Sequence, residues 1–587
     1  MSRKTFQIFA LVVIFSMLFT ACAQPLPVAP SAAAPAAADA APADSGSAAA
    51  TGTAQRGGVW TRATSSDAGN LNPILSDNTA SSDVMYLLYD VGLVGGDLET
   101  GALTCDGALC DTWEVSDDGL VYTFALKDGF NWNDGTPVTA ADFVYTYSAI
   151  NSDLVESPRK YVWDSIESIA APDAKTVVVT YNNLRCDALY DLGNPLMPAH
   201  IFAADFSDIQ ESPENFAPTV GSGPVNFQSW QRDDNLIVVR NENYYLGAPN
   251  MDGMIYRVVP DAGTRLAMLQ SKESDILRVQ PNQIATVDQN PDLTRYTWED
   301  DGYTYIGLNL GNPANPQNGR DENGEVIAQD PHPILGDKAV RQAIATALDY
   351  DSIINDIFLG QGFRQSSNVM PAVSWAYDDT LAPYNFDVDA ANALLDAAGW
   401  VDSNGDGVRE KDGVDLSLSL ITNAGNTTRV DLGTYVQDAL SNIGIQVDFQ
   451  AVEFGTMLDQ MDAQTFDMYI IGWTGLGPDP ATDYPFFHSG DDVVGSGFNN
   501  VSYFNADVEQ AMDEGRSVAG CALEDRAPFY KQVQAQIKED VPYIFITGSQ
   551  SNVAYNNKWE GLDPKPWAAS EPVYWNTHEW FMKDLAQ

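Results

Sequence analysis

The fold is most strongly constrained by a regular alternation of two hydrophobic periods between residues 414 and 473. Residues 414–420 and 445–449 alternate apolar and polar side chains, as half-buried strands do, and residues 468–471 form a short apolar run. Between these strands lie two segments with apolar residues at helical spacing, 428–442 and 457–461. This order of strand, helix, strand, helix, strand predicts an α/β lobe whose neighbouring strands are parallel.

The loop from Gly472 to Ser489 follows the last of these strands. In such sheets, ligands bind beyond the carboxyl ends of the strands, where neighbouring loops diverge. The loop is glycine-rich and aromatic, and it contains the carboxylates of Asp479 and Asp483. The ring of Trp473 combines a large contact area with an N–H donor, which favours a role in binding a small molecule. The alternative is that Trp473 only anchors the loop.

The first 22 residues have the pattern of a signal peptide. Arg3 and Lys4 precede an apolar stretch, residues 6–19, that is too short to cross a bilayer as a helix. Thr20-Ala21-Cys22 resembles a lipoprotein cleavage site, so we expect a lipid on Cys22; an ordinary cleaved signal is the alternative. Residues 23–55, almost wholly Ala, Pro, Ser, Gly and Thr, predict a disordered tether.

These features predict an exported protein on the outer face of the cytoplasmic membrane or in the periplasm, attached to the membrane by lipid alone. The 81 acidic and 30 basic residues give a formal charge of −51, which disfavours binding to nucleic acid or anionic lipid. About 530 residues remain after the tether, too many for one core, and predict two or three lobes. We expect this folded part to be a monomer.

Four cysteines remain if Cys22 carries lipid, and export permits disulfides between them. Three pairings are open. We favour a short loop closed by Cys105 and Cys110, with Cys186 and Cys521 forming a long-range bridge. No pair has the CxxC spacing of a zinc or redox site.

Residues 402–413 partly match a calcium-binding loop. Oxygen-bearing side chains stand at positions one, three and five, with glycine at six, but Gly413 replaces the glutamate at position twelve. Calcium is therefore one interpretation and a plain Asn-Gly/Asp-Gly turn the other. The candidate calcium ligands are Asp402, Asn404, Asp406, Val408 and Glu410.

The chain lacks the patterns of common catalytic sites, so we expect a protein that is not an enzyme. It has no G-x-S-x-G motif and no P-loop. No internal period suggests a repeat-built adhesin. A secreted glycosidase with paired carboxylates is the alternative that the many acidic residues leave open. The four histidines are scattered without the spacing of a helical zinc site: His200, His332, His488 and His578.

Six ordered motifs make the chain, from about Gly57 to its end, similar to the family 5 solute-binding proteins of peptide- and nickel-type ABC importers. The motifs are Leu71-Asn72-Pro73 with Tyr86-Leu87-Leu88-Tyr89; 113–119 with 124–129; 133–137 with 139–143; 221–224; 340–344; and Gly472-Trp473.

The resemblance implies an α/β periplasmic-binding-protein fold, in which two lobes close on a hinge around a peptide or similarly sized solute. It also implies that the closed form docks on a membrane permease driven by ATPases. A subdomain is inserted in the first lobe. The expected boundaries are 56–95, 216–298 and 546–587 for lobe I, 96–215 for the inserted subdomain, and 299–545 for lobe II.

The candidate solute contacts come from both lobes. In lobe II they are Trp473, Asp479 and Tyr484, with Tyr305 and Asn309 from a predicted strand at residues 303–310; in lobe I they are Asn78 and Tyr86.

One position departs from the peptide-binding members of the family. In these members, a carboxylate shortly after the Gly-Trp pair binds the ammonium group of the ligand, but Leu476 stands at the corresponding place here. A peptide amino terminus would then need Asp479 or Asp483 instead. Otherwise the solute is an oligosaccharide or another neutral polar molecule that stacks on Trp473.

Overall fold

The computed structural model describes residues 56–76, 78–163, 165–373, 375–474, 476–566 and 571–583, without the side chains of residues 300, 301 and 549. The predicted signal peptide, Cys22 and the tether lie outside these ranges. Every helix within them is too short or too polar to cross a membrane.

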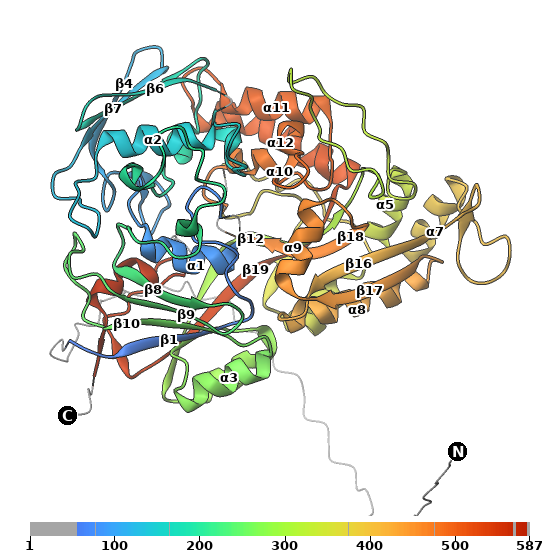
Figure 1. Ribbon diagram of the computed structural model, residues 1–587. Helices are drawn as coiled ribbons and strands as arrows, with labels where there is room; N and C mark the ends of the chain where they lie inside the picture. Colours follow the sequence, from blue (N-terminus) through green and yellow to red (C-terminus); the bar gives the residue numbers. More distant parts are fainter. Residues whose placement is uncertain are drawn as a thin grey trace, which may run out of the picture. The chain divides into compact units, whose positions relative to one another are not determined.

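A mixed sheet of eleven strands organises the fold (Figure 1). β16 pairs in parallel with both β17 and β18, which confirms the parallel arrangement predicted from the hydrophobic pattern. The strands, in spatial order, are β17 (Gln446–Val452), β16 (Ser417–Asn423), β18 (Met468–Trp473), β12 (Leu293–Leu308), β19 (Tyr543–Asn556), β11 (Ile276–Arg278), β1 (Val59–Thr64), β10 (Gly253–Val258), β9 (Asn235–Arg240) and β8 (Val225–Gln231), with β13 (Gly362–Arg364) beside β19.

The helices follow from local capping and from burial of one face. Asn426 caps α8 by accepting a hydrogen bond from the Arg429 amide, and Asp387 caps α7 by accepting one from Ala390. The longer helices are α1 (Thr79–Leu88), α2 (Ala140–Ile150), α3 (Ala262–Ser271), α5 (Lys338–Thr346), α7 (Val388–Ala397), α8 (Thr427–Ser441), α9 (Phe454–Asp462), α11 (Ala506–Arg516) and α12 (Leu523–Asp540).

Several further elements are short. They are α4 (Ile284–Asp288), α6 (Tyr350–Ser352) and α10 (Tyr484–Phe487), and the paired strands β2 (Gly95–Gly96) with β3 (Leu103–Thr104), β14 (Glu410–Lys411) with β15 (Val414–Asp415), and β20 (Trp559–Glu560) with β21 (Phe581–Met582).

Two long strands, β12 and β19, connect the two halves of the large sheet. The first half contains β1 and β8–β11, and the second contains β16–β18. The two long strands pair antiparallel along two stretches, with a register shift between Glu299 and Tyr303. Before the shift, β12 pairs with residues 550–556 of β19; after it, β12 pairs with residues 543–548. The described chain therefore passes from one half to the other through β12 and returns through β19.

Each half of the sheet packs into its own hydrophobic core. The first core contains Trp60 of β1, Met254 of β10 and Val553 of β19. A second contains Leu420 of β16 and Ile544 of β19. A third lies under the loop after β18 and joins Tyr305 of β12 to α11 and α12; its members include Phe487, Met512 and Val533. We refer to these as the first, second and third cores.

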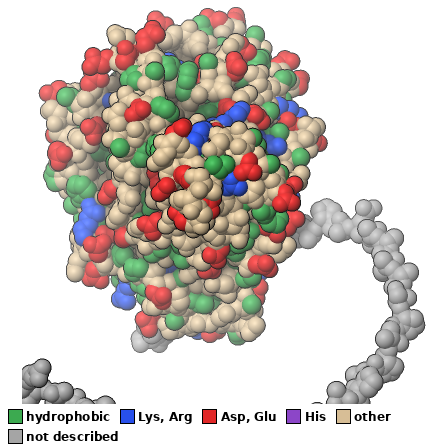
Figure 2. Space-filling model, turned by 90° about the vertical axis from the view of Figure 1, so that its right-hand side faces the viewer, with side chains coloured by type: hydrophobic (Ala, Val, Ile, Leu, Met, Phe, Trp, Pro, Cys, Tyr) green, Lys and Arg blue, Asp and Glu red, His purple; other side chains and the backbone are tan. Residues whose placement is uncertain are grey.

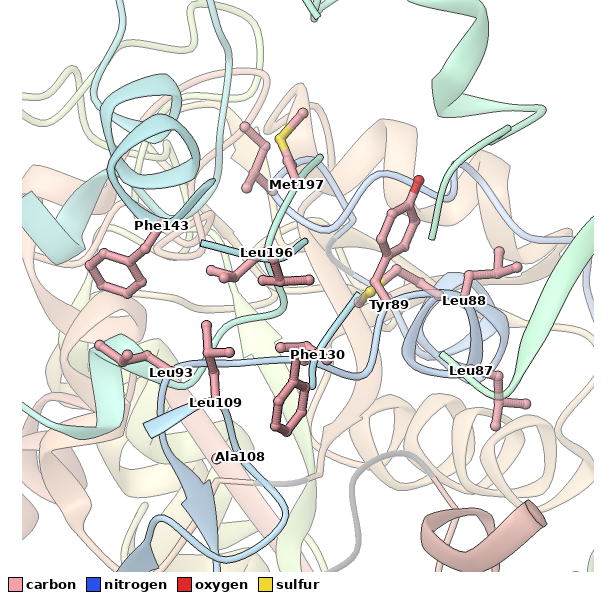
Figure 3. Packing of buried hydrophobic residues seen from close by; sticks show 14 of the residues in the cluster. Leu87, Leu88, Tyr89, Leu93, Ala108, Leu109, Phe130, Phe143, Leu196 and Met197 are labelled. Atoms are coloured by element: carbon pink, nitrogen blue, oxygen red, sulfur yellow. The ribbon is translucent and has the colours of Figure 1, made fainter. Parts of the chain in front are cut away.

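A hairpin formed by residues 110–126 lies within a separate four-stranded sheet. Its spatial order is β4 (Cys110–Val115), β5 (Val121–Leu126), β7 (Thr176–Tyr181) and β6 (Ile166–Asp173). Helix α2 packs on this sheet, and both contribute to the first core. Figure 3 shows part of that core, where Phe143 of α2 lies near Leu93, Leu109 and Leu196.

The structure contains the two disulfides favoured by the sequence, Cys105–Cys110 and Cys186–Cys521. Cys110 is buried in the first core and Cys105 packs against it. Outside the cores, Asp and Glu side chains are spread over the molecular surface, as Figure 2 shows for one face. This distribution agrees with the excess of 81 acidic over 30 basic residues.

Gly302, within the register shift, allows β12 to pack closely on the end of β18. A Cβ atom at Gly302 would lie 1.9 Å from the carbonyl oxygen of Trp473. We expect Gly302→Ala to lower the free energy of unfolding by about 1–3 kcal/mol, because one backbone must move. Urea denaturation measures this change. The control is Gly96→Ala, where the nearest atom is 3.9 Å from the added Cβ; equal stability of the two variants would contradict the prediction.

Candidate functional site

The candidate site begins where β16 and β18 end. These two strands are parallel, so their carboxyl ends, Asn423 and Trp473, meet at the same edge of the sheet. β12 runs antiparallel to β18 and pairs Tyr303 with Trp473. The sheet thus brings an indole ring, tyrosines and the start of α8 together at one edge, as expected for α/β sheets.

Trp473 is a half-buried member of an aromatic cluster. Its half-buried ring stacks on Phe486, with ring centres 4.1 Å apart and 15° between the planes. Phe498 meets the indole edge-on at 5.8 Å. Tyr305 is fully buried and stacks on Tyr543 at 4.0 Å. Trp473 therefore offers a fixed flat surface, supported from behind by the other rings.

Arg429, in the first turn of α8, supplies a cation beside this cluster. Its Nη1 donates a hydrogen bond to Asn423 Oδ1 at 3.0 Å. Its Nη2 would lie 3.2 Å from a Cβ atom at Gly472, which places the guanidinium next to the end of β18. Among the described residues no carboxylate forms an ion pair with it, and burial lowers the pKa of Arg429 to about 10. The guanidinium remains charged at neutral pH.

Residues attached to the first half of the sheet close over the start of α8. Arg265 of α3 donates a hydrogen bond from Nη2 to the Gly425 carbonyl at 2.9 Å. Gln280, just after β11, accepts a hydrogen bond from the Thr427 amide at 3.2 Å. These contacts join residues from the two halves of the sheet at the start of α8.

Asp479 differs from its expected role as a solute contact. Its carboxylate is buried and bidentate with Arg526 of α12, at 2.7 and 2.9 Å, and it also accepts a hydrogen bond from the Ala481 amide. Burial raises the pKa of Asp479, and Arg526 opposes this rise. The carboxylate therefore anchors the loop to α12. Leu476 is also buried and belongs to the third core.

Asn309 likewise has its polar atoms engaged within the protein. Its Nδ2 donates to the carbonyls of Gln464 and Phe466, and its Oδ1 accepts from the Gly311 amide. Both ends of this buried side-chain amide are therefore hydrogen-bonded within the protein, which differs from the expected role of Asn309 as a solute contact.

The other residues predicted to contact solute lie away from the strand ends or are packed inside the protein. Tyr484 is buried between His488, which stacks on it at 4.3 Å, and Arg516, whose guanidinium lies 3.9 Å from the ring centre. Asn78 caps α1, and half-buried Tyr86 packs on the first core. Of the predicted set, the structure brings together Trp473 and Tyr305, whose ring centres are 6.4 Å apart.

Sequence reasoning missed three residues of the candidate site: Arg429, Arg265 and Gln280. Only Arg429 had a local signal, since it follows a cap at the end of a predicted strand. The contacts of Arg265 and Gln280 join residues more than a hundred positions apart.

The loop at residues 402–410 is organised as a turn. Asp402 accepts hydrogen bonds from the amides of Gly405 and Gly407, and Asp406 accepts one from Val408. Asn404 accepts from Asp406, and Glu410 accepts from Ser403. Within the described ranges, no group of three or more His, Cys, Asp or Glu residues could hold a metal ion. These contacts form a turn, and the calcium interpretation stays a prediction.

Comparisons with known proteins give a consistent result. A model of the bacterial extracellular solute-binding proteins, family 5 (middle), matches residues 105–494. The oligopeptide-binding protein AppA of Bacillus subtilis is 30% identical over 87% of this chain and 89% of its own length. The dipeptide-binding protein of Escherichia coli is 24% identical over 75% of this chain and 80% of its own.

Solved structures confirm the predicted periplasmic-binding-protein fold. The structure of Bacillus subtilis AppA in complex with a nonapeptide has a TM-score of 0.80 and 28% identity, covering 90% of this chain and 100% of that one. NikZ of Campylobacter jejuni in complex with Ni(L-His) has a TM-score of 0.77 and 24% identity, covering 89% and 99%.

The position of Asp479 predicts a structural phenotype for Asp479→Asn. Loss of one partner leaves Arg526 buried without its counter-charge, which costs about 3–5 kcal/mol. We expect a fall of this size in the free energy of unfolding, measured by urea denaturation. The control is Asp525→Asn, an exposed carboxylate on the same helix. A variant with normal stability but impaired solute binding would instead restore Asp479 as a direct contact.

Proposed function

Since the chain belongs to family 5 of the bacterial extracellular solute-binding proteins, and is thus a non-enzymatic solute receptor of an ABC importer, we propose that it binds a peptide or similarly sized solute through an anionic group. The observation that carries this proposal is the guanidinium of Arg429 beside Trp473, without a carboxylate partner among the described residues. Family membership also excludes the glycosidase alternative.

A carboxylate is the anion that suits this position best. The planar guanidinium matches the two oxygens of a carboxylate, and charge-assisted hydrogen bonds of this kind are about twice as strong as neutral ones. Arg429 also lies in the first turn of α8, where the helix dipole favours negative charge. A peptide carboxyl terminus or an acidic side chain would meet both requirements.

Leu476 is apolar and buried. The two carboxylates that could bind a peptide amino terminus in its place already have partners among the described residues, Arg526 for Asp479 and Asn368 for Asp483. Recognition in this proposal therefore rests on the anionic end of the solute and on apolar contact with Trp473. An uncharged oligosaccharide could use the indole ring but would leave Arg429 unpaired, so it is the weaker candidate.

In this proposal the solute is held between two lobes that rotate about β12 and β19. Lobe I comprises residues 56–95, 216–298 and 546–587 with 96–215 inserted, and lobe II comprises 299–545. The register shift and the separate cores support this division, with a crossing of β19 near residue 549. The closed form would dock on the permease, and a lipid on Cys22 would keep the receptor at the membrane.

The test compares short peptides that have a free carboxyl terminus with the same peptides amidated. We expect the protein to bind the free form at least about tenfold more tightly, since hydrogen bonds to charged groups contribute about 1.5–3 kcal/mol. Arg429→Gln should remove this difference. Isothermal titration gives the affinities.

Arg257→Gln, at an exposed position of β10, is the matched control and should retain the preference. Equal binding of free and amidated peptides, or a preference that survives in Arg429→Gln, would contradict the proposed role of Arg429.

A further inference from the structure

The Cys186–Cys521 disulfide joins parts of the chain that belong to separate cores. Tyr181 and Ala188, on either side of Cys186, are buried in the first core. Cys521 lies in the turn between α11 and α12, which contribute Met512 and Val533 to the third core. The bond is therefore a covalent link between the two halves of the protein in addition to β12 and β19.

The segments that carry the two cysteines are held in place by buried ion pairs. Arg516 Nε lies 2.9 Å from Asp187 Oδ2, and Arg185 Nη2 lies 2.6 Å from the same oxygen and 2.7 Å from Asp191 Oδ2. Although burial acts to raise it, Arg185 and Arg516 hold the pKa of Asp187 below its usual value. The Cys186 amide also donates a hydrogen bond to the Arg516 carbonyl at 2.7 Å.

The disulfide lies off the line of the two connecting strands. α12 leads into β19 through two residues, Val541 and Pro542, so it runs back along β19. Its 18 residues span about 27 Å, so its first turn lies far from its junction with β19. A helix is about 10 Å across, and we take this width as the distance of Cys521 from the connecting strands. Figure 1 shows α11 and α12 facing the side of the molecule that carries α2.

We propose that the Cys186–Cys521 disulfide is a clasp that restricts separation of the two lobes, so that solute exchanges more slowly in the oxidised protein than in the reduced one. The expected effect on solute exchange rests on the proposed solute site. The expected restriction of lobe opening is independent of that site, because it follows from the connections between the two halves.

The largest distance that a disulfide can span between Cα atoms limits how far the two lobes can separate. The Cα atoms of Cys186 and Cys521 are 5.3 Å apart, and disulfides rarely span more than about 6.8 Å between Cα atoms. A rotation of about 20° about the connecting strands would move a point about 10 Å away by about 3.5 Å, which exceeds the remaining reach. The oxidised clasp therefore permits only a small rotation.

Opening the clasp is a two-electron reduction. A dithiol reductant attacks one sulfur, forms a mixed disulfide and then its own disulfide, while the two cysteine sulfurs leave as thiolates and take up two protons. Both cysteines are half-buried, so part of their surface is exposed to solvent.

The first test measures opening without any solute, by small-angle X-ray scattering. It compares the oxidised protein, Cys186→Ser/Cys521→Ser, and Cys105→Ser/Cys110→Ser, which removes the disulfide confined to the first core. We expect a larger radius of gyration for the first double variant alone. Dithiothreitol treatment of the unmodified protein should give the same increase, which provides a second route if the substitutions impair folding. An unchanged radius after verified loss of the bond overturns the clasp.

The second test measures the dissociation rate of a bound peptide by stopped flow. We expect release to be about tenfold faster without the clasp, equivalent to about 1.4 kcal/mol. A larger radius with unchanged release would overturn the effect on exchange. Failure of every peptide to bind would instead count against the proposed solute class, while the scattering result would still decide the clasp.

Discussion

The pairing of β12 with β19 is the constraint on which the rest of the structure depends. These strands belong to both halves of the large sheet, and their ladder changes register where the chain passes from one core to the next. A backbone hydrogen-bond ladder resists sliding but yields to bending at an irregularity. The ladder therefore fixes which strands of the two halves are neighbours but allows the angle between the halves to change, and in the proposal above the Cys186–Cys521 disulfide restricts that angle.

The arginines of this acidic protein differ in the side chains that they contact. Arg526, Arg185 and Arg516 are each paired with aspartate, so their charges are compensated within the fold. Arg429 has an amide as its side-chain partner. Burying a cation without a counter-charge is unfavourable, and in this proposal the anionic group of the solute supplies the missing charge at Arg429. The contrast among these arginines is the physical basis for assigning an anionic solute.

The sequence predicted the local structure well because hydrophobic period and capping act over short distances. The helix expected at 428–442 is α8, residues 427–441, and the strand expected at 468–471 is β18. The site was predicted less completely. Trp473 was found from its place at a strand end, but the role of Asp479 depends on Arg526, 47 residues away. Whether a polar side chain is engaged or available depends on tertiary partners that no local pattern reveals.

The pairing of Tyr303 with Trp473 places the aromatic surface directly beside the strands about which the halves would turn. Atoms near a rotation axis travel little, so the indole and the rings behind it keep their arrangement at any angle between the halves. A solute that enters the open receptor would thus meet a preformed aromatic binding surface. The ordering cost of that surface is met during folding, before the solute arrives, which leaves more of the contact energy available to favour closure.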